Sequence, residues 1–164
     1  MKVFSTPYFT IEAITSPCDR EPYYKIVQRD SVLALVLGKE QEIILVRQYR
    51  PIVQEYTLEF PAGSVEENES PLEAVEREVG EELGLVCDFT YLGPAKLQVN
   101  RSSSFEHIFF GRELCILDVN LHQTERVRIS IDNFRSMVRQ GKFQQIAALG
   151  ILPLLEIKTG LRII

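Results

Sequence analysis

The sequence predicts an α/β fold in which a mixed central sheet is sandwiched between helices. Three observations support this prediction. Apolar runs of strand length fill much of residues 8–60, a capped amphipathic helix follows at residues 70–83, and further strand-like runs precede two helical segments at the C-terminal end. Strands on both sides of a central helix, closed by C-terminal helices, are typical of a sheet covered on both faces.

The first part of the chain is expected to be mostly strand. Turn-forming clusters such as Ser16-Pro17 and Gly38-Lys39 separate the runs, and Pro61-Ala62-Gly63 forms a tight loop that leads into the central helix. The predicted strands are Tyr8 to Ile14, Tyr23 to Val27, Ser31 to Leu37, Glu42 to Tyr49 and Thr57 to Phe60.

The central helix has its own start and stop signals. Ser70 fits the N-cap, Pro71 fits the first helical position, and Glu73 completes a Ser-x-x-Glu capping box. Gly84 falls where a left-handed C-terminal cap is expected. The glycine at position 80 is unusual, because glycine inside a helix costs about 1 kcal/mol relative to alanine, and close approach of another backbone would explain it. The stripe expected to pack on the sheet is Leu72, Val75, Val79 and Leu83.

The remaining elements follow the same reasoning. Strands are predicted near Asp88 to Leu92, Ala95 to Gln98, His107 to Leu114 and Arg126 to Ile129. Helices are predicted near Asp132 to Gln140 and Gln144 to Ile157.

Bulk properties favour one ordinary soluble domain spanning residues 1–164. The chain is 45% hydrophobic and 25% charged, and its net charge of −5 argues against a nonspecific nucleic-acid binder. The longest apolar stretch, Ile146 to Leu155, is interrupted by Pro153 and is too short to span a bilayer. The three cysteines, Cys18, Cys87 and Cys115, are scattered, and residues 1–20 lack the apolar core of a signal peptide. These features predict a cytoplasmic protein without nucleic-acid or membrane partners.

The central helix also presents an acidic face. Glu78, Glu81 and Glu82 share an arc of about 100°, separate from the apolar stripe. Like charges at i,i+4 disfavour a helix, so the cluster is better explained by a bound cation, and hard oxygen ligands favour Mg²⁺ or Mn²⁺. Taken alone, such an arc is more often a solvated helix face. Arg77 can pair with Glu73 and Glu81 within the helix or hold a metal-binding carboxylate in one rotamer, and both roles can coexist.

Arginines suited to phosphate precede this helix. Arg47 and Arg50 lie at the end of a predicted strand, in the segment Arg47-Gln48-Tyr49-Arg50-Pro51. Strand alternation places them on opposite faces, so one of the two is expected to reach a substrate. The alternative for either is a solvated or ion-paired strand end.

The spacing of the helix residues identifies a known signature. Residues 63–85 match G-x5-E-x7-R-E-U-x-E-E-x-G-U, where U is aliphatic. This is the Nudix box, and the chain resembles the Nudix hydrolase superfamily. The segment from Val46 to Leu85, with RQYRP and LEFPAG, is similar to the ADP-ribose pyrophosphatases, and the general resemblance extends from about Tyr23 to Ile157. It implies the Nudix α/β/α sandwich and hydrolysis of a phosphoric anhydride by metal-activated water, without a protein nucleophile.

The resemblance also implies roles for individual residues. Metal would be bound by Glu78, Glu82 and the main-chain carbonyl of Ala62, with Glu81 assisting. Gly63, Glu69 and Arg77 would orient these ligands. Glu59 would lie near metal or substrate, and Glu125, on the loop before the last strand, is the candidate general base unless it is merely solvated.

Two features depart from the ADP-ribose pyrophosphatase pattern. Arg101 stands where those enzymes commonly have proline, so it is a candidate for reading a phosphate or sugar. The chain has no tryptophan to stack on a base, and Phe4, Tyr23 or Tyr24 either substitute for it or pack in a core or dimer. The resemblance implies a homodimer to which N-terminal strands, about residues 1–30, contribute.

Three functions therefore remain open. The first is Mg²⁺-dependent cleavage of ADP-ribose or a related nucleoside diphosphate sugar into a nucleoside monophosphate and a sugar phosphate. The second is hydrolysis of another nucleoside diphosphate linked to X, such as a dinucleoside polyphosphate or an oxidised nucleotide. The third is a noncatalytic nucleotide-sugar sensor, against which the intact acidic cluster argues, because a sensor has less reason to retain self-repelling carboxylates.

Overall fold

The computed structural model describes residues 1–15, 21–119, 121 and 124–164. Its centre is a mixed sheet whose main strands run in the order β10-β5-β4-β9-β8. The pair formed by β4 (Ser31–Leu37) and β9 (Glu106–Ile116) is parallel. The pairs with β5 (Ile43–Arg50), β8 (Leu85–Ala95) and β10 (Thr124–Ile129) are antiparallel. The predicted mixed sheet is confirmed.

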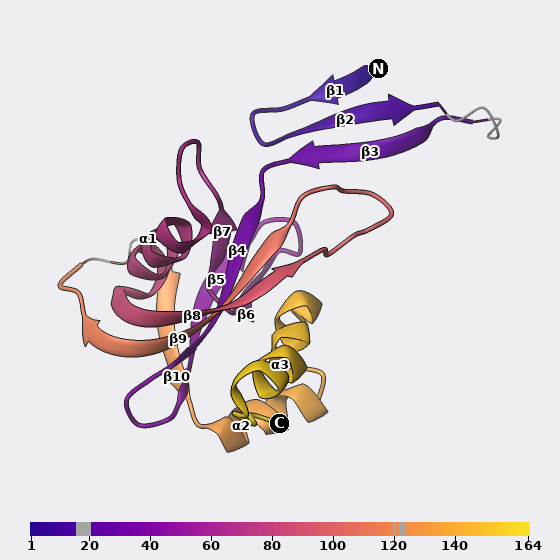
Figure 1. Ribbon diagram of the computed structural model, residues 1–164. Coiled ribbons are helices and arrows are strands. Elements are labelled where there is room, and N and C mark those ends of the chain that lie inside the picture. Colours follow the sequence, from indigo (N-terminus) through magenta and orange to yellow (C-terminus); the bar gives the residue numbers. More distant parts are fainter. Residues whose placement is uncertain (16–20, 120, 122–123) are drawn as a thin grey trace.

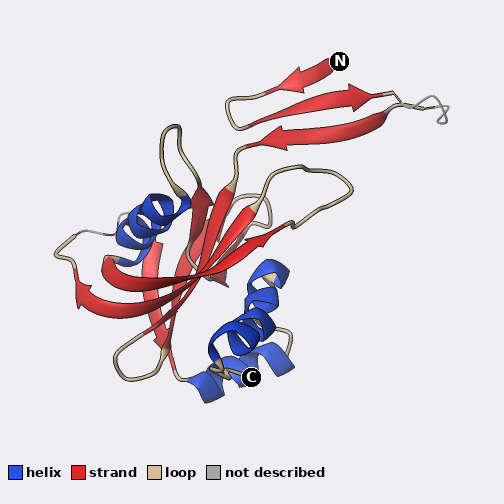
Figure 2. Cartoon of the chain, in the orientation of Figure 1, coloured by secondary structure: helices blue, strands red, loops and turns tan. Residues whose placement is uncertain are grey.

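Helices cover both faces of this sheet, as Figures 1 and 2 show. On one face lies α1 (Pro71–Leu83), and on the other lie α2 (Ile131–Arg139) and α3 (Ile146–Thr159). Strand β4 is apolar and buried from Val32 to Leu37, as expected for a strand covered on both faces. Val32, Ala34 and Val36 pack in the cluster beneath α1, whereas Leu33, Leu35 and Leu37 pack in the cluster beneath α3. Successive side chains of β4 therefore point to opposite faces of the sheet, and the side chains of the strands paired with β4 can be assigned to the same two faces.

Two short strands shape the region where α1 begins. Strand β6 (Glu55–Glu59) pairs with β5, and β7 (Ala62–Ser64) pairs with the first residues of β4. Only the last two residues of β4 pair with β5. Strand β7 therefore pairs with the start of β4, next to the acidic face of α1. The tight loop predicted at Pro61-Ala62-Gly63 was wrong for Ala62 and Gly63, which belong to β7.

The N-terminal residues form a second, separate sheet. It contains β1 (Lys2–Ser5), β2 (Phe9–Ile14) and β3 (Tyr23–Gln28), all antiparallel, and it projects away from the core in Figure 1. The loop between β8 and β9 joins its edge, where the Ile26 N–H donates to the Arg101 carbonyl at 2.7 Å. Strand β1 was not predicted.

Helix α1 has the predicted ends. The Ser70 side chain accepts from the Glu73 N–H, and the Glu73 carboxylate accepts from the Ser70 N–H. Gly84 closes the helix with φ 61°. The predicted stripe was wrong at Leu72, which is 46% exposed, while Ala74 is fully buried. A helical wheel fixes the direction of a side chain but does not say whether the sheet extends beneath that turn.

The strand predicted at Asp88 to Leu92 is part of a longer strand, β8, which begins directly after Gly84 and ends at Ala95. The separate strand predicted at Ala95 to Gln98 was therefore wrong. Pro94 lies within β8, which is the edge of the sheet, where a missing N–H is tolerated. The register of β8 against β9 shifts between Tyr91 and Gly93, and Gly93 has a φ of 124°, as is common at a bulge. None of the helices among the described residues is both long and apolar enough to cross a membrane.

Candidate active site

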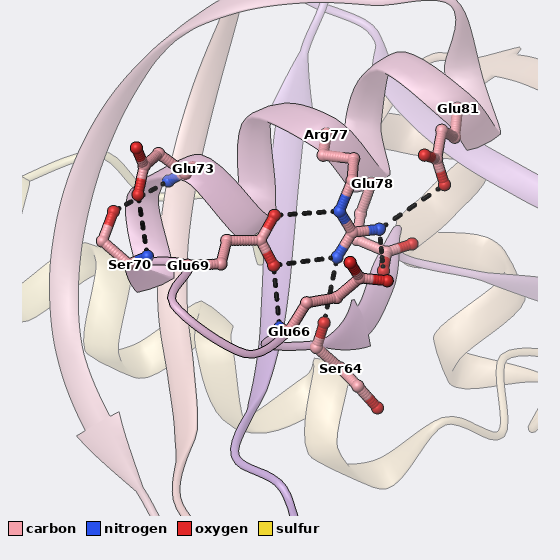
Figure 3. Close-up of polar contacts among 8 residues, drawn as sticks. All are labelled: Ser64, Glu66, Glu69, Ser70, Glu73, Arg77, Glu78 and Glu81. Atoms are coloured by element: carbon pink, nitrogen blue, oxygen red, sulfur yellow. Dashed lines mark hydrogen bonds and ion pairs between the residues drawn. The ribbon is translucent and has the colours of Figure 1, made fainter.

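Arg77 forms hydrogen bonds to several acidic side chains and to a backbone carbonyl (Figure 3). Its guanidinium donates to both oxygens of Glu69, at 2.9 and 3.1 Å, to Glu78 at 2.7 Å and to the Ser64 carbonyl at 3.0 Å. Nη1 of Arg77 also lies 3.5 Å from Oε2 of Glu81, whose side chain is 63% exposed. These hydrogen bonds lower the pKa of the Glu69 carboxyl below its usual value. The expected pairing of Arg77 with Glu73 was wrong, because Glu73 caps the helix instead.

Gly63 allows Glu78 to lie against the backbone of β7. A Cβ atom on Gly63 would stand 1.9 Å from Oε1 of Glu78, far inside van der Waals contact. Only glycine fits this position with Glu78 in its observed place. The short strand β7 and the helix α1 are thus brought together around one carboxylate.

Glu82 lies one turn beyond Glu78 and is more deeply buried. Its Oε2 accepts a hydrogen bond from the Ala62 N–H at 3.1 Å. Burial, together with the negative charge of Glu78, raises the pKa of the Glu82 carboxyl to about 7, despite the opposing effect of the Ala62 N–H. Burial also raises the pKa of Glu78, although Arg77 counteracts it. Two carboxylates with raised pKa values are therefore held on one face of α1, where a cation would stabilise their charged forms.

Arg50 and Glu59 lie on the same face of the sheet as α1. The guanidinium of Arg50 donates to both oxygens of Glu59, at 2.8 and 2.7 Å, and Thr57 donates to Oε1 of Glu59. The charges of this pair reach Glu82, since Arg50 lowers and Glu59 raises its pKa. Arg50 is 45% exposed, so its guanidinium is anchored on one side and open on the other.

Arg47 and Glu125 lie on the opposite face of the sheet. Their paired backbones place both side chains with the cluster beneath α3, and Arg47 donates to Glu125 at 2.8 Å. The Arg47 guanidinium also stacks on Tyr56 at 4.2 Å. The expectation that Glu125 lies on a loop was wrong, because β10 already begins at Thr124. The structure does not bring Arg47 or Glu125 to the acidic face of α1.

Arg101 is placed beside the N-terminal sheet and not beside α1. Its guanidinium lies 5.6 Å from the centre of the Tyr23 ring. Tyr23, Tyr24 and Phe4 are about half exposed on that sheet. These residues form a surface separate from the acidic cluster within one chain.

A cleft of about 660 Å³ runs along α1. Its lining includes the expected Arg77, Glu78, Glu81 and Glu82. Sequence reasoning did not assign the six further lining residues to the site: Gln48, Glu76, Gly80, Leu117, Val119 and Thr124. Glu76 and Gly80 lie on α1 itself. Nothing in the local sequence marks the other four, because only the pairing of β10 with β5 and the path after β9 bring them to α1. Thr124 fixes this arrangement by donating to the Glu82 carbonyl at 2.8 Å.

The acidic cluster on α1 has few protein ligands for a metal ion. Over the residues that the structure describes, no three acidic, histidine or cysteine side chains are grouped closely enough to hold a metal by themselves. Mg²⁺ is usually bound through one or two carboxylates together with substrate phosphates. Glu78 and Glu82 both have raised pKa values and lie against the backbone of β7, at Gly63 and Ala62 respectively, so they fit a shared site of that kind.

The sequence is similar to two curated pyrophosphatases. A mouse (Mus musculus) ADP-sugar pyrophosphatase is 47% identical over 53 residues, covering 32% of this chain and 24% of that protein. An ADP-ribose pyrophosphatase of Bacillus subtilis (strain 168) is 27% identical over 110 residues, covering 66% of this chain and 60% of that protein. The chain thus spans between a quarter and three fifths of the length of these relatives.

A solved structure described as an ADP compounds hydrolase superposes with a TM-score of 0.79 and 22% identity, covering 96% of this chain and 89% of that one. It confirms the α/β/α fold. The model of the NUDIX domain matches residues 27–146, which include β4 to β10, α1 and every carboxylate of the acidic cluster. The chain belongs to the NUDIX domain family.

Proposed function

We propose that the chain is a metal-dependent pyrophosphatase that splits ADP-ribose or a related nucleoside diphosphate sugar into a nucleoside monophosphate and a sugar phosphate. The observation on which this rests is the pair Glu78 and Glu82 on one face of α1, in a cleft of about 660 Å³, with Glu78 against Gly63 and Glu82 hydrogen-bonded to the Ala62 N–H. The names of the mouse and Bacillus subtilis relatives support the substrate class.

Glu78 and Glu82 would hold Mg²⁺ or Mn²⁺, with the Ala62 carbonyl and Glu81 as further ligands. The ion supplies charge neutralisation at the phosphate oxygens and a lowered pKa for an attacking water. Arg77 positions Glu78 through its 2.7 Å hydrogen bond, and Glu69 in turn holds Arg77. This chain of contacts keeps one carboxylate in place before substrate arrives.

Arg50 would bind the diphosphate. Its planar fork suits phosphate oxygens, and Glu59 holds it beside the acidic cluster. Arg47 is on the wrong face of the sheet for this role. The same argument applies to Glu125 as a general base, and we propose no catalytic role for it.

A substrate panel tests the proposal. Purified protein with Mg²⁺ or Mn²⁺ is incubated with ADP-ribose, other nucleotide sugars, NADH, diadenosine polyphosphates and nucleoside triphosphates, and phosphorylated products are measured. We expect fastest release from a nucleoside diphosphate sugar, and none with EDTA present. Preference for a dinucleoside polyphosphate would overturn the substrate class. Binding of ADP-ribose without turnover would identify a sensor.

We further propose a cytoplasmic homodimer formed through the N-terminal sheet. Phe4, Tyr8 and Tyr24 expose much of their apolar surface there, and such surface is typical of an interaction site. Arg101 and Tyr23 lie at the edge of that sheet and would face the partner. Cys87 and Cys115 are free thiols, which suits a reducing compartment.

A further inference from the structure

The cleft along α1 has two unlike walls. The helix side presents carboxylates, among them Glu76 and Glu81. The facing side presents the hydrocarbon side chains of Leu117 and Val119, which are 37% and 51% exposed. The proposed hydrolysis needs carboxylates but gives no reason for an apolar wall.

This apolar wall is fixed to the end of α1. The Leu117 N–H donates to the Gly84 carbonyl at 2.8 Å. A Cβ atom on Gly84 would stand 3.0 Å from Cγ2 of Val119, so the wall packs closely on the helix cap. Arg126 donates to the Leu83 carbonyl at 2.7 Å and closes the same corner. Leu117 and Val119 are therefore held at the C-terminal end of α1.

Gly80 lies on α1 between these walls. Glycine is a poor helix former, so its presence inside a helix calls for a reason. A Cβ atom at this position would meet only Cδ1 of Leu117, at 3.8 Å, which is ordinary van der Waals contact. The close backbone approach expected from the sequence was therefore wrong. What the missing side chain leaves is open space within the cleft.

We propose that Gly80, Leu117 and Val119 form the subsite for the sugar of a nucleoside diphosphate sugar, and that the space above Gly80 determines which sugars are accepted. This rests on the proposed function. A sugar ring has carbon-rich faces and hydroxyl donors at its rim. It therefore fits between an apolar wall and carboxylates that accept its hydrogen bonds. A nucleobase fits less well, because it offers fewer donors to these carboxylates than a ring of hydroxyl groups and would also turn its acceptor nitrogens and carbonyl oxygens toward them.

The test compares sugars that share one base and bases that share one sugar. We would measure kcat/KM of the parent, Gly80→Ala, Gly80→Leu and Leu117→Ala with ADP-ribose, ADP-glucose, ADP-mannose and GDP-mannose. Gly80→Leu should lower kcat/KM for the hexoses relative to ADP-ribose by about 10-fold. Leu117→Ala should shift the same ratio toward the hexoses. The ratio of ADP-mannose to GDP-mannose should not change.

Stability measurements separate this role from a structural one. Gly80→Ala should raise the Tm by a few degrees, since alanine favours the helix, while it shifts sugar preference in the direction of Gly80→Leu. Leu72→Ala, on an exposed turn of α1 outside the cleft, is the matched control and should leave both sugar and base preference unaltered. If Gly80→Leu does not fold, Gly80→Ala and Leu117→Ala decide the outcome.

The possible failures are distinguishable. A parent enzyme that hydrolyses no nucleotide sugar overturns the proposed function and this inference together. An active parent whose Gly80 and Leu117 variants keep the parental sugar ratios overturns the inference alone. A change in base preference without a change in sugar preference also overturns it.

Discussion

The buried negative charge of Glu82 destabilises the folded, metal-free protein, whereas the proposed function needs that charge to bind a metal ion. Its pKa is about 7 in the folded protein, compared with an ordinary 4.5. Between these values the folded state retains a proton that the unfolded state has lost. The metal-free protein therefore loses stability as pH rises from about 4.5 to about 7. A buried carboxylate that destabilises the metal-free protein is expected where that carboxylate serves as a metal ligand.

We predict that Glu82→Gln abolishes activity and stabilises the metal-free protein. Glutamine keeps the shape of the side chain but has no charge to bury. At pH 8 the variant should be more stable by about 1–3 kcal/mol in denaturant unfolding, with kcat lowered by roughly 100-fold or more. Parental activity would refute its role at the metal, and an unchanged pH dependence of stability would refute the raised pKa.

Gly63 offers a second prediction for a single residue. Gly63→Ala should displace Glu78, because the new methyl group would occupy the place of its carboxylate. We expect the apparent Mg²⁺ affinity in activity titrations to fall by about 10–100-fold. Gly150→Ala on α3 is the control, since a Cβ atom there meets nothing within 4 Å, and it should leave Mg²⁺ affinity unchanged. Equal affinity in both variants would contradict the account.

Single residues also show where sequence reasoning ends. Helical periodicity was enough to predict that Glu78, Glu81 and Glu82 share one face of α1, and all three line the cleft. Arg47 and Glu125 are different, since their positions depend on the register between β5 and β10. That register is a long-range property, and a short sequence window contains no information about it.

At the scale of elements, local signals predicted α1 well and the sheet less well. The capping box and Gly84 defined both ends of α1 through contacts within a few residues. Strand β7 and the continuity of β8 could not be predicted in this way. Three residues become a strand only because β4 lies beside them, and Pro94 is tolerated only because β8 is an edge.

Strands β9 and β10 are joined by an ion pair that gives a prediction at this scale. Arg128 donates to both oxygens of Glu113, at 2.7 and 2.8 Å, and the Glu113 side chain is 4% exposed. These bonds lower the pKa of Glu113 below its usual value. Because the folded-state pKa is lowered, the stabilisation is present above the ordinary glutamate pKa and is lost as pH falls below it.

Glu113→Gln should therefore destabilise the protein at pH 7 and flatten its acid unfolding curve. We expect a loss of about 1–3 kcal/mol at pH 7, measured by urea unfolding, because Arg128 would lose one of its two charged partners among the described residues and keep only Glu42. The difference between parent and variant should shrink as pH falls below about 4.5. A difference that stays constant from pH 7 to pH 3 would show that the ion pair does not contribute.

At the scale of the whole molecule, the core and the N-terminal sheet differ in how far their apolar side chains are buried. The core buries its apolar side chains in two clusters, one on each face of the sheet. The N-terminal sheet leaves large side chains exposed, including Phe4 and Tyr8. An isolated three-stranded sheet gains stability when another surface covers it, which supports its assignment to a dimer interface.

We predict that the parent sediments as a dimer at micromolar concentrations and that Phe4→Asp shifts it toward monomer. A buried, unpaired carboxylate would be costly at an interface. Ile157→Asp, on the 80% exposed position of α3, is the matched control and should remain dimeric. Dimers of equal strength in both variants would place the interface elsewhere.

The central claim is that Glu78 and Glu82 gather a divalent cation at the substrate diphosphate. Crystals grown with Mn²⁺ and a non-hydrolysable ADP-ribose analogue test it directly by anomalous scattering. We predict a manganese peak at about 2.2 Å from a carboxylate oxygen of each residue, with a phosphate oxygen as a further ligand. A bound analogue with no manganese at these two carboxylates would contradict the account.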